Sequence, residues 1–285
     1  MSIKIIQERL DAYHCTSDRD EQQAMREISQ EVALMGLSRS GFFQAAAFQG
    51  GTCLRVLYSL ERFSEDLDFV LMKATRTFHW KTYLKGLTDE FAFYGYEATI
   101  QDRSTVDETV KKAFLKDDSI GQRLHLRHRS LRGRPKTIRI KLEIDVNPPT
   151  GSNHETRYLD FPLPFSVTVQ DLPSLFASKC HALLCREYVK GRDWYDFLWY
   201  TARKVPINFK LLQNALDQQG PWKQRRPKVE KNWLLQELGK KIQSIDWAEA
   251  KRDTARFVKQ RELQTLELWS TLFFLDRAKK LAFYL

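Results

Sequence analysis

The spacing of apolar residues divides the chain into a helical start, a mixed middle and a helical end. From residue 1 to about 48, apolar positions recur three and four apart, which predicts helices and includes the segment GFFQAAAF. From Gly50 the pattern predicts a helix, a strand, a helix and then paired strands as far as about residue 170. After the Pro-rich segments NPPTGSN and FPLPF, taken as a connection, helical spacing persists to Leu285.

This order of elements predicts an α+β fold, with a mixed β-sheet core flanked by helices. The 285 residues exceed one average domain, and we expect N-terminal helices plus a core over 1–170 and a helical C-terminal domain over 171–285. A hydrophobic content of 42% without any run of eighteen apolar residues predicts a soluble protein with no membrane partner. Four scattered cysteines and the absence of a signal-peptide pattern favour the cytoplasm.

Two segments carry carboxylates on the strand face that the apolar residues leave open. Alternate side chains of a strand point to opposite faces, so in SEDLDFVL the residues Asp66 and Asp68 share one face. In TIRIKLEIDV the same alternation groups four charged residues: Arg139, Lys141, Glu143 and Asp145. If the two strands are neighbours, their carboxylates cluster and repel each other unless a hard cation such as Mg²⁺ neutralises them.

A glycine-rich turn precedes the first of these strands. Gly50, Gly51 and Thr52 lead into TCLRVLYSL, which has helical spacing, so N–H groups at the start of a helix are available to a phosphate. A Gly-Gly-Thr alone is usually a turn, and an Asp-x-Asp alone is usually a surface pair or a cap. Together, fourteen residues apart from Thr52 to Asp66 and followed by a second acidic strand, they indicate a metal-dependent phosphate site.

Basic residues are concentrated in two runs, and the net charge is +10. The longer run, RLHLRHRSLRGRPKTIRIK, contains no acidic residue and is predicted to form two strands joined by a turn at residues 132–136. We expect six of its residues to contact nucleic acid: Arg123, Arg127, Arg129, Arg132, Arg134 and Lys136. The alternative is a solvated surface, which is the expected role of His125 and His128. The shorter run is KQRRPK, residues 223–228.

A later helical block carries further charged residues. Lys179 and Arg186 are seven apart and share one face of a helix that begins near Leu172 and that Gly191 is expected to end. Asp193 stands at the entry of the next helix, either as an N-cap or as a functional acid, and Asp196 lies one turn further in. The aromatic residues of WYDFLWY are predicted to be core.

Each of two arginines near the glycine turn has two alternative interpretations. Arg55 reaches the triphosphate or pairs with Glu61, and Arg62, just before the acidic strand, has the same ambiguity.

The segment GGTCLRVLYSLERFSEDLDF resembles the Gly-Gly-(Ser/Thr), helix, Asp-x-Asp signature of the DNA polymerase β-like nucleotidyltransferases. More narrowly, it resembles the AbiEii/AbiGii nucleotidyltransferase toxin family of type IV toxin-antitoxin systems. Blocks of that family are similar to three segments of this sequence: RFSEDLDF, EISQEVALMGLSRSGFFQAAAFQGG and KCHALLCREYVKGRDWYDFLWY. The likeness covers about residues 20–200, and Thr52 stands where the wider superfamily prefers serine.

The resemblance implies a role for each matching position. The implied metal ligands are Asp66, Asp68 and Glu143, with Asp145 the competing third carboxylate. The implied nucleotide-binding residues are Gly50, Gly51, Thr52, Lys179 and Asp193, and Arg55 is added to them from its place one turn into the following helix. The implied catalytic residues are Asp66, Asp68, Glu143, Asp145, Lys179 and Asp196.

The predicted function is therefore Mg²⁺-dependent transfer of a nucleoside monophosphate from a nucleoside triphosphate to an acceptor, with the 3′ end of tRNA as the leading acceptor. The resemblance implies that a cognate antitoxin restrains this toxin. Two alternatives stay open. A metal-dependent nuclease needs clustered acids but no glycine turn before them, and a non-catalytic nucleic-acid-binding protein would be expected to lack at least one of Asp66, Asp68 and Lys179.

Overall fold

A computed structural model describes residues 2–103, 109–128 and 137–284. The chain divides into two compact units, each built from several segments. The sheet unit comprises residues 1–59, 63–148 and 155–169, and the helical unit comprises residues 60–62, 149–154 and 170–285. Each unit is described by itself.

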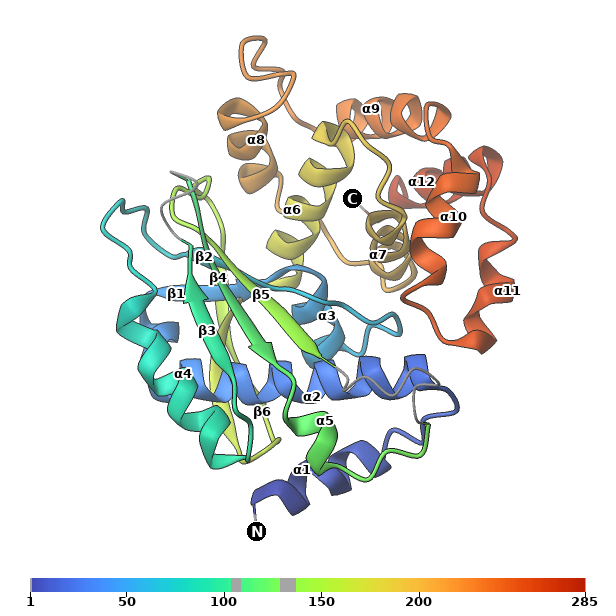
Figure 1. Cartoon of the computed structure of the whole chain (residues 1–285). Helices are drawn as coiled ribbons and strands as arrows, with labels where there is room; N and C mark the ends of the chain where they lie inside the picture. Colours follow the sequence, from blue (N-terminus) through green and yellow to red (C-terminus); the bar gives the residue numbers. More distant parts are fainter. Residues whose placement is uncertain (1, 104–108, 129–136, 285) are drawn as a thin grey trace. The chain divides into compact units, whose positions relative to one another are not determined.

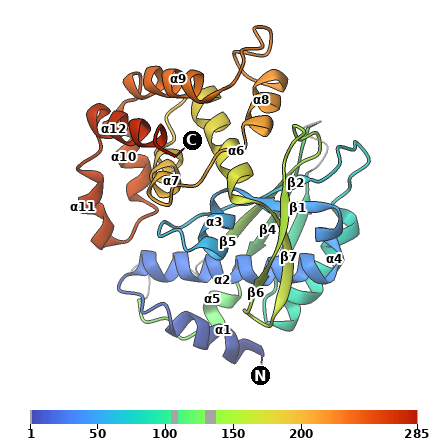
Figure 2. The ribbon, with the colours of Figure 1, turned by 180° about the vertical axis from the view of Figure 1, so that it is seen from behind.

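The sheet unit is built on a mixed sheet that has seven strands in the described residues, in the order β3-β4-β5-β2-β1-β7-β6 (Figures 1 and 2). Its strands are β1 (Ala46–Gln49), β2 (Leu67–Leu71), β3 (Thr99–Asp102), β4 (Val110–Asp117), β5 (Ile138–Asp145), β6 (His154–Leu159) and β7 (Phe165–Gln170). Its helices are α1 (Ser2–Asp11), α2 (Asp18–Arg39), η1 (Phe42–Gln44), α3 (Gly50–Tyr58), α4 (Lys81–Phe93) and α5 (Ile120–Arg123). The central strand β2 is parallel to β5 and antiparallel to β1.

The alternation of β5 decides which face of the sheet is buried. Ile138, Ile140, Leu142 and Ile144 are buried, whereas the charged residues between them are more exposed. α2 packs against β5 and α4, and α1 packs against α2. Burial of one complete face fixes the register, because a slip of one residue would turn every apolar side chain outwards. The charged residues of β2 and β5 are therefore held on the opposite face.

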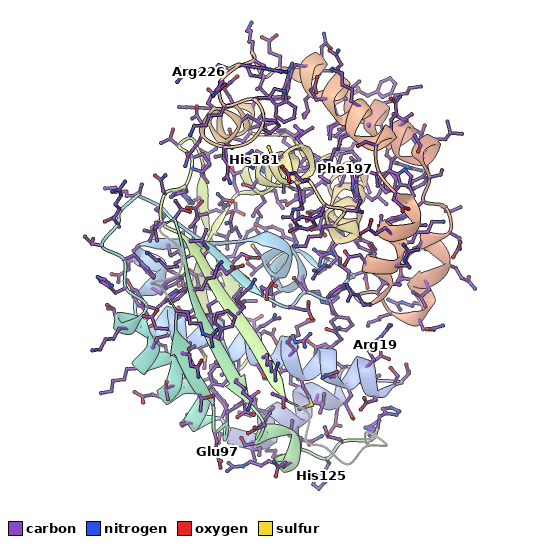
Figure 3. All side chains as sticks on the ribbon, turned by 45° about the horizontal axis from the view of Figure 1, so that its top comes forward. Arg19, Glu97, His125, His181, Phe197 and Arg226 are labelled. Atoms are coloured by element: carbon purple, nitrogen blue, oxygen red, sulfur yellow. The ribbon has the colours of Figure 1, made fainter. Side chains whose placement is uncertain are left out.

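The helical unit consists of α6 (Leu172–Cys185), α7 (Gly191–Ala202), α8 (Phe209–Gln218), α9 (Lys231–Gln243), α10 (Trp247–Ala255), η2 (Gln260–Glu262), α11 (Leu263–Leu266) and α12 (Thr271–Leu281). Asp171 caps α6 by accepting from the Ser174 N–H. Aromatic rings fill the core: Phe197 is fully buried among these helices (Figure 3), and the Trp247 and Phe274 rings stack at 4.1 Å. This confirms that the aromatic residues of WYDFLWY are mainly core.

Four local predictions are wrong, for identifiable reasons. GFFQAAAF forms η1 and then β1, because successive alanines fit helical and strand periods equally well. The Pro-rich connection contains β6 and β7, with its prolines at and beyond the strand ends. In the described residues the antiparallel neighbour of β5 is β4, and residues 125–128 form no strand. The predicted turn at residues 132–136 lies outside the described part.

The fourth correction concerns Gly191, which begins α7 and does not end α6. A Cβ atom at this position would lie 1.9 Å from the Ala250 carbonyl oxygen of α10. Glycine is therefore required by the close approach of two helices. In the described residues, no helix is both long and apolar enough to cross a membrane.

A buried carboxyl group on α2 makes the stability of the sheet unit depend on pH. The Glu31 side chain is 4% exposed and accepts from Arg9 Nη2 of α1 at 2.8 Å. Burial raises the pKa of Glu31 to about 7, although Arg9 opposes this shift.

The folded state thus favours protonated Glu31, and the unfolding free energy should fall as pH rises from about 4.5 to about 7, by up to about 3 kcal/mol. Glu31→Gln cannot ionise and should lack this component. The free energy of unfolding of both proteins is measured by urea denaturation. As pH rises from 5 to 8, we expect that of the wild type to fall relative to that of Glu31→Gln. A change in the opposite direction would show that the ion pair with Arg9 dominates.

Candidate active site

The candidate site of the sheet unit is a row of side chains across four adjacent strands. Strand register places Gln49 of β1 opposite Asp68 of β2, Asp68 beside Glu143 of β5, and Glu143 opposite Lys112 of β4. Neighbours in register point to the same face of a sheet, so Asp68 and Glu143 are side by side. The sequence predicted that these strands carry acids on one face, and the pairing of β2 with β5 brings the acids together.

The glycine turn directly adjoins this row. Gly50 follows Gln49, has φ +80° and begins α3. A Cβ atom at Gly50 would lie 2.5 Å from Asp68 Oδ2, so the turn passes against the carboxylate. Only glycine combines this backbone conformation with such a close approach. The N-terminus of α3, with its outward N–H groups and positive dipole end, is thereby placed beside the acidic residues.

Thr52 and Arg55 are held by contacts within the sheet unit. The Thr52 hydroxyl is fully buried and donates to the Asp66 carbonyl, which ties α3 to the start of β2. Arg55 donates to Glu27 of α2 at 2.8 Å and lies over the Phe63 ring. The choice for Arg55 between the triphosphate and Glu61 stays open, and the nucleotide roles of Thr52 and Arg55 remain predictions.

Two lysines to which sequence analysis assigned no role accompany the carboxylates. We call these five side chains the acidic row: Asp66, Asp68, Glu143, Lys141 and Lys112. Lys141 Nζ lies 2.9 Å from Glu143 Oε2 and 3.6 Å from Asp66 Oδ2, and Lys112 Nζ lies 3.7 Å from Glu143 Oε1. Partial burial lowers the pKa of Lys141, but the hydrogen bond with Glu143 and the charge of Asp66 outweigh it and raise that pKa. The alternation of β5 had placed Lys141 on the acidic face, so the signal was present in the sequence.

The donor set suits a hard divalent cation. Asp66, Asp68 and Glu143 offer oxygen ligands only, and the Lys141 ammonium shows that a cation is accommodated between Asp66 and Glu143. As they stand, no three His, Cys, Asp or Glu side chains of the described residues are grouped to hold a metal ion. Metal ligation therefore requires these side chains to rearrange around the place that the ammonium takes.

The two candidates for the third carboxylate differ in position. Glu143 is the register neighbour of Asp68, whereas Asp145 is the neighbour of Val70. The Asp145 Oδ1 atom also accepts from the Asn147 N–H at 2.9 Å, in the turn after β5. Glu143 is thus the candidate beside Asp68 in the register, and the choice of the third carboxylate remains a prediction.

The later block forms a buried ionic cluster inside the helical unit. Asp196 is fully buried and accepts from Arg62 twice, at 2.6 and 2.7 Å. Lys179 Nζ lies 2.8 Å from Asp196 Oδ2 and 2.7 Å from Asp193 Oδ1, and Arg186 lies 3.2 Å from Asp193 Oδ2. Lys190 is the N-cap of α7, so Asp193 does not have that role. A contact of Arg62 with the triphosphate remains a prediction.

Charge compensation opposes the effect of burial on Lys179 and Asp193. Burial lowers the pKa of Lys179, but Asp193 and Asp196 outweigh it and raise that pKa. Burial raises the pKa of Asp193, but Lys179 and then Arg186 hold it well below its usual range. The nucleotide-binding roles of Lys179 and Asp193 and the catalytic roles of Lys179 and Asp196 remain predictions.

The basic run is described only in part. Arg123 donates to the Gly95 carbonyl and to Glu97, and the Arg127 side chain lies 3.5 Å from Asp11. Glu97 and His125 lie at the same end of the sheet unit (Figure 3). Four predicted contacts lie outside the described residues: Arg129, Arg132, Arg134 and Lys136. The run KQRRPK is exposed apart from Pro227 and projects at Arg226 from the helical unit (Figure 3).

Two solved structures share this fold over nearly the whole chain. A "putative nucleotidyltransferase" from H. pylori has 17% identity and a TM-score of 0.52, covering 92% of this chain and 97% of its own. JHP933 from Helicobacter pylori has 16% identity and a TM-score of 0.51, covering 92% and 94%. The comparison with curated proteins gave no match. The chain thus shares the fold of these two structures, which confirms the predicted α+β fold with a mixed sheet flanked by helices.

The family model of the nucleotidyl transferase AbiEii toxin, type IV toxin-antitoxin system, matches residues 32–271. The chain belongs to this family and is a nucleotidyltransferase, which confirms the resemblance found in its motifs. Membership implies a nucleoside triphosphate substrate and an antitoxin partner.

Gly50→Ala should separate the two reasons for glycine at this turn. A side chain at φ +80° costs on the order of 1–2 kcal/mol, and the added Cβ should also displace the Asp68 carboxylate. Gly41→Ala is the matched control, because φ is +77° there and the nearest atom, in the Gln44 side chain, is 3.7 Å away. We expect similar losses of melting temperature, but a loss of nucleotide transfer on the order of 100-fold only in Gly50→Ala. Equal activities would contradict the contact with Asp68.

Asp196→Asn should strongly destabilise the helical unit. The substitution keeps the shape but removes the charge that Arg62 and Lys179 share, so we expect a loss of about 3–5 kcal/mol in the free energy of unfolding. Glu237→Gln, which breaks the exposed pair with Lys240, should cost less than about 1 kcal/mol. Chemical denaturation measures both. A loss in Asp196→Asn as small as in the control would show that the cluster is not important for stability.

Proposed function

We propose that this nucleotidyltransferase transfers a nucleoside monophosphate to the 3′ end of an RNA, with tRNA as the leading acceptor, and that it requires a divalent metal ion. The observation that carries the proposal is the contact of the Gly50 turn with Asp68, beside Glu143. It combines a helix N-terminus suited to phosphate with carboxylates suited to a cation and to proton transfer.

In the proposed reaction, the acceptor hydroxyl oxygen bonds to the α-phosphorus, the bond from that phosphorus to the bridging oxygen breaks, and pyrophosphate leaves. The N–H groups at the start of α3 bind phosphate oxygens, and Gly50 lets the backbone approach them closely. Glu143 takes the proton from the acceptor hydroxyl. Its place beside Asp68 puts this carboxylate next to the side chain that would hold the metal ion, near the reacting phosphate. Asp66, Asp68 and Glu143 would hold Mg²⁺, which stabilises negative charge on the reacting phosphate when it is bound.

The RNA acceptor is proposed from charge. Arg123, Arg127 and the run at residues 223–228 provide exposed cations, which gain free energy by neutralising phosphates and releasing counterions. They carry no base-specific information, so the family resemblance supplies the preference for tRNA. Blocking the 3′ end of tRNA would stop translation, and a cognate antitoxin would neutralise this effect.

The proposed function predicts label transfer that depends on Asp68. The purified protein is incubated with Mg²⁺, total RNA and each α-labelled nucleoside triphosphate in turn. We expect labelled RNA of tRNA size from the wild type and a loss on the order of 100-fold or more in Asp68→Asn, which keeps the shape but not the charge. Asp118→Asn is the control, because this exposed acid pairs with Lys116 outside the acidic row.

Each result has a distinct meaning. Label in another RNA class would retain the transferase and overturn the tRNA acceptor. RNA shortened without label incorporation would favour the nuclease. Equal transfer by the wild type and Asp68→Asn would overturn the assignment of the site.

A further inference from the structure

The position of Lys141 in the acidic row has a consequence for metal binding. Its ammonium lies between Asp66 and Glu143, at 3.6 and 2.9 Å. Asp66 directly precedes β2, whereas Glu143 lies in β5. Both belong to the set that the proposed function assigns to the metal. A divalent ion and the Lys141 ammonium therefore require the same oxygen atoms.

The geometry points to Lys141 as a built-in competitor of the metal, which must leave Asp66 and Glu143 before a divalent ion can bind there. The inference rests on the proposed function and concerns the same site. Lysine suits this exchange, because its charge is carried on a flexible four-carbon stem with a third of the side chain exposed. Asp196, by contrast, is held by a planar guanidinium at two points and is fully buried.

Competition of this kind links metal binding to nucleotide binding. Without nucleotide, the displaced ammonium loses its contacts with two carboxylates and is hydrated instead. With a triphosphate at the α3 N-terminus, the ammonium can pair with phosphate oxygens near the same row. The triphosphate should therefore increase metal affinity more when Lys141 is present than when it is absent. The site would be weakly loaded by metal alone and strongly loaded by metal with nucleotide.

The first test measures Mn²⁺ binding without nucleotide, by electron paramagnetic resonance of the unbound ion. We expect Lys141→Met to bind Mn²⁺ more tightly than the wild type, on the order of tenfold or more, because a positive charge within 4 Å of the ligands is removed. Lys141→Arg retains the charge and should stay as weak as the wild type. Lys116→Met makes the same charge change on β4, where Lys116 pairs with Asp118, and should alter binding less than about twofold.

The second test repeats the titrations with a non-hydrolysable nucleoside triphosphate. We expect the increase in Mn²⁺ affinity caused by the nucleotide to be several-fold larger in the wild type than in Lys141→Met. Equal increases would overturn the link to nucleotide binding. Circular dichroism melting of each variant shows whether it is folded, and the comparison of Lys141→Arg with the wild type stands even if Lys141→Met is unstable.

The outcomes separate this inference from the proposed function. Mn²⁺ binding that requires Asp68 but has the same affinity in the wild type and Lys141→Met would overturn the competition and retain the metal site. Tighter binding in Lys141→Arg would also overturn it, because the charge is still present. Absence of Mn²⁺ binding in the wild type and in Lys141→Met, with or without nucleotide, would overturn both the competition and the metal dependence.

Discussion

The repulsion between Asp68 and Glu143 is the constraint on which the sheet unit depends. Strand register holds the two carboxylates side by side, and register cannot relax because the opposite face of β5 is buried against α2. Like charges in neighbouring positions destabilise a sheet unless cations compensate them. Lys141 and Lys112 provide this compensation. The free energy of hydrophobic burial thus maintains a charge arrangement that the strands alone would not adopt.

The glycine turn is matched to the same constraint. Asp68 leaves no room for a side chain at Gly50, and the left-handed backbone there turns the chain from β1 into α3 beside the acidic row. The Thr52 hydroxyl closes the arrangement by bonding to the Asp66 carbonyl. The N–H groups proposed to bind phosphate and the carboxylates proposed to bind a metal ion are therefore held by one local structure, in which α3 and β2 support each other.

Most of the sheet site could be predicted because strands obey a period of two. Alternation alone placed Asp66, Asp68 and Glu143 on an open face, and the pairing of β2 with β5 places Asp68 beside Glu143. The ion pair of Arg62 with Asp196 could not be found in this way, since it joins residues 134 positions apart and periodicity reports only local direction. The edge strand β6 was missed for a related reason: half of its residues are exposed and only Leu159 is buried, so it gives little alternation.

The two groups of charges in this protein differ in whether they can exchange partners. Asp196 and Asp193 are 0% and 5% exposed, and removal of any one partner would leave a buried charge uncompensated. Asp66 and Glu143 are 38% and 22% exposed, so water can stabilise them while one cation replaces another. A catalytic carboxylate must change partners in every cycle, whereas a structural one must not. By this criterion the acidic row of the sheet can exchange cations, whereas the cluster around Asp196 holds its partners, so any role of that cluster in nucleotide transfer would have to leave these ion pairs intact.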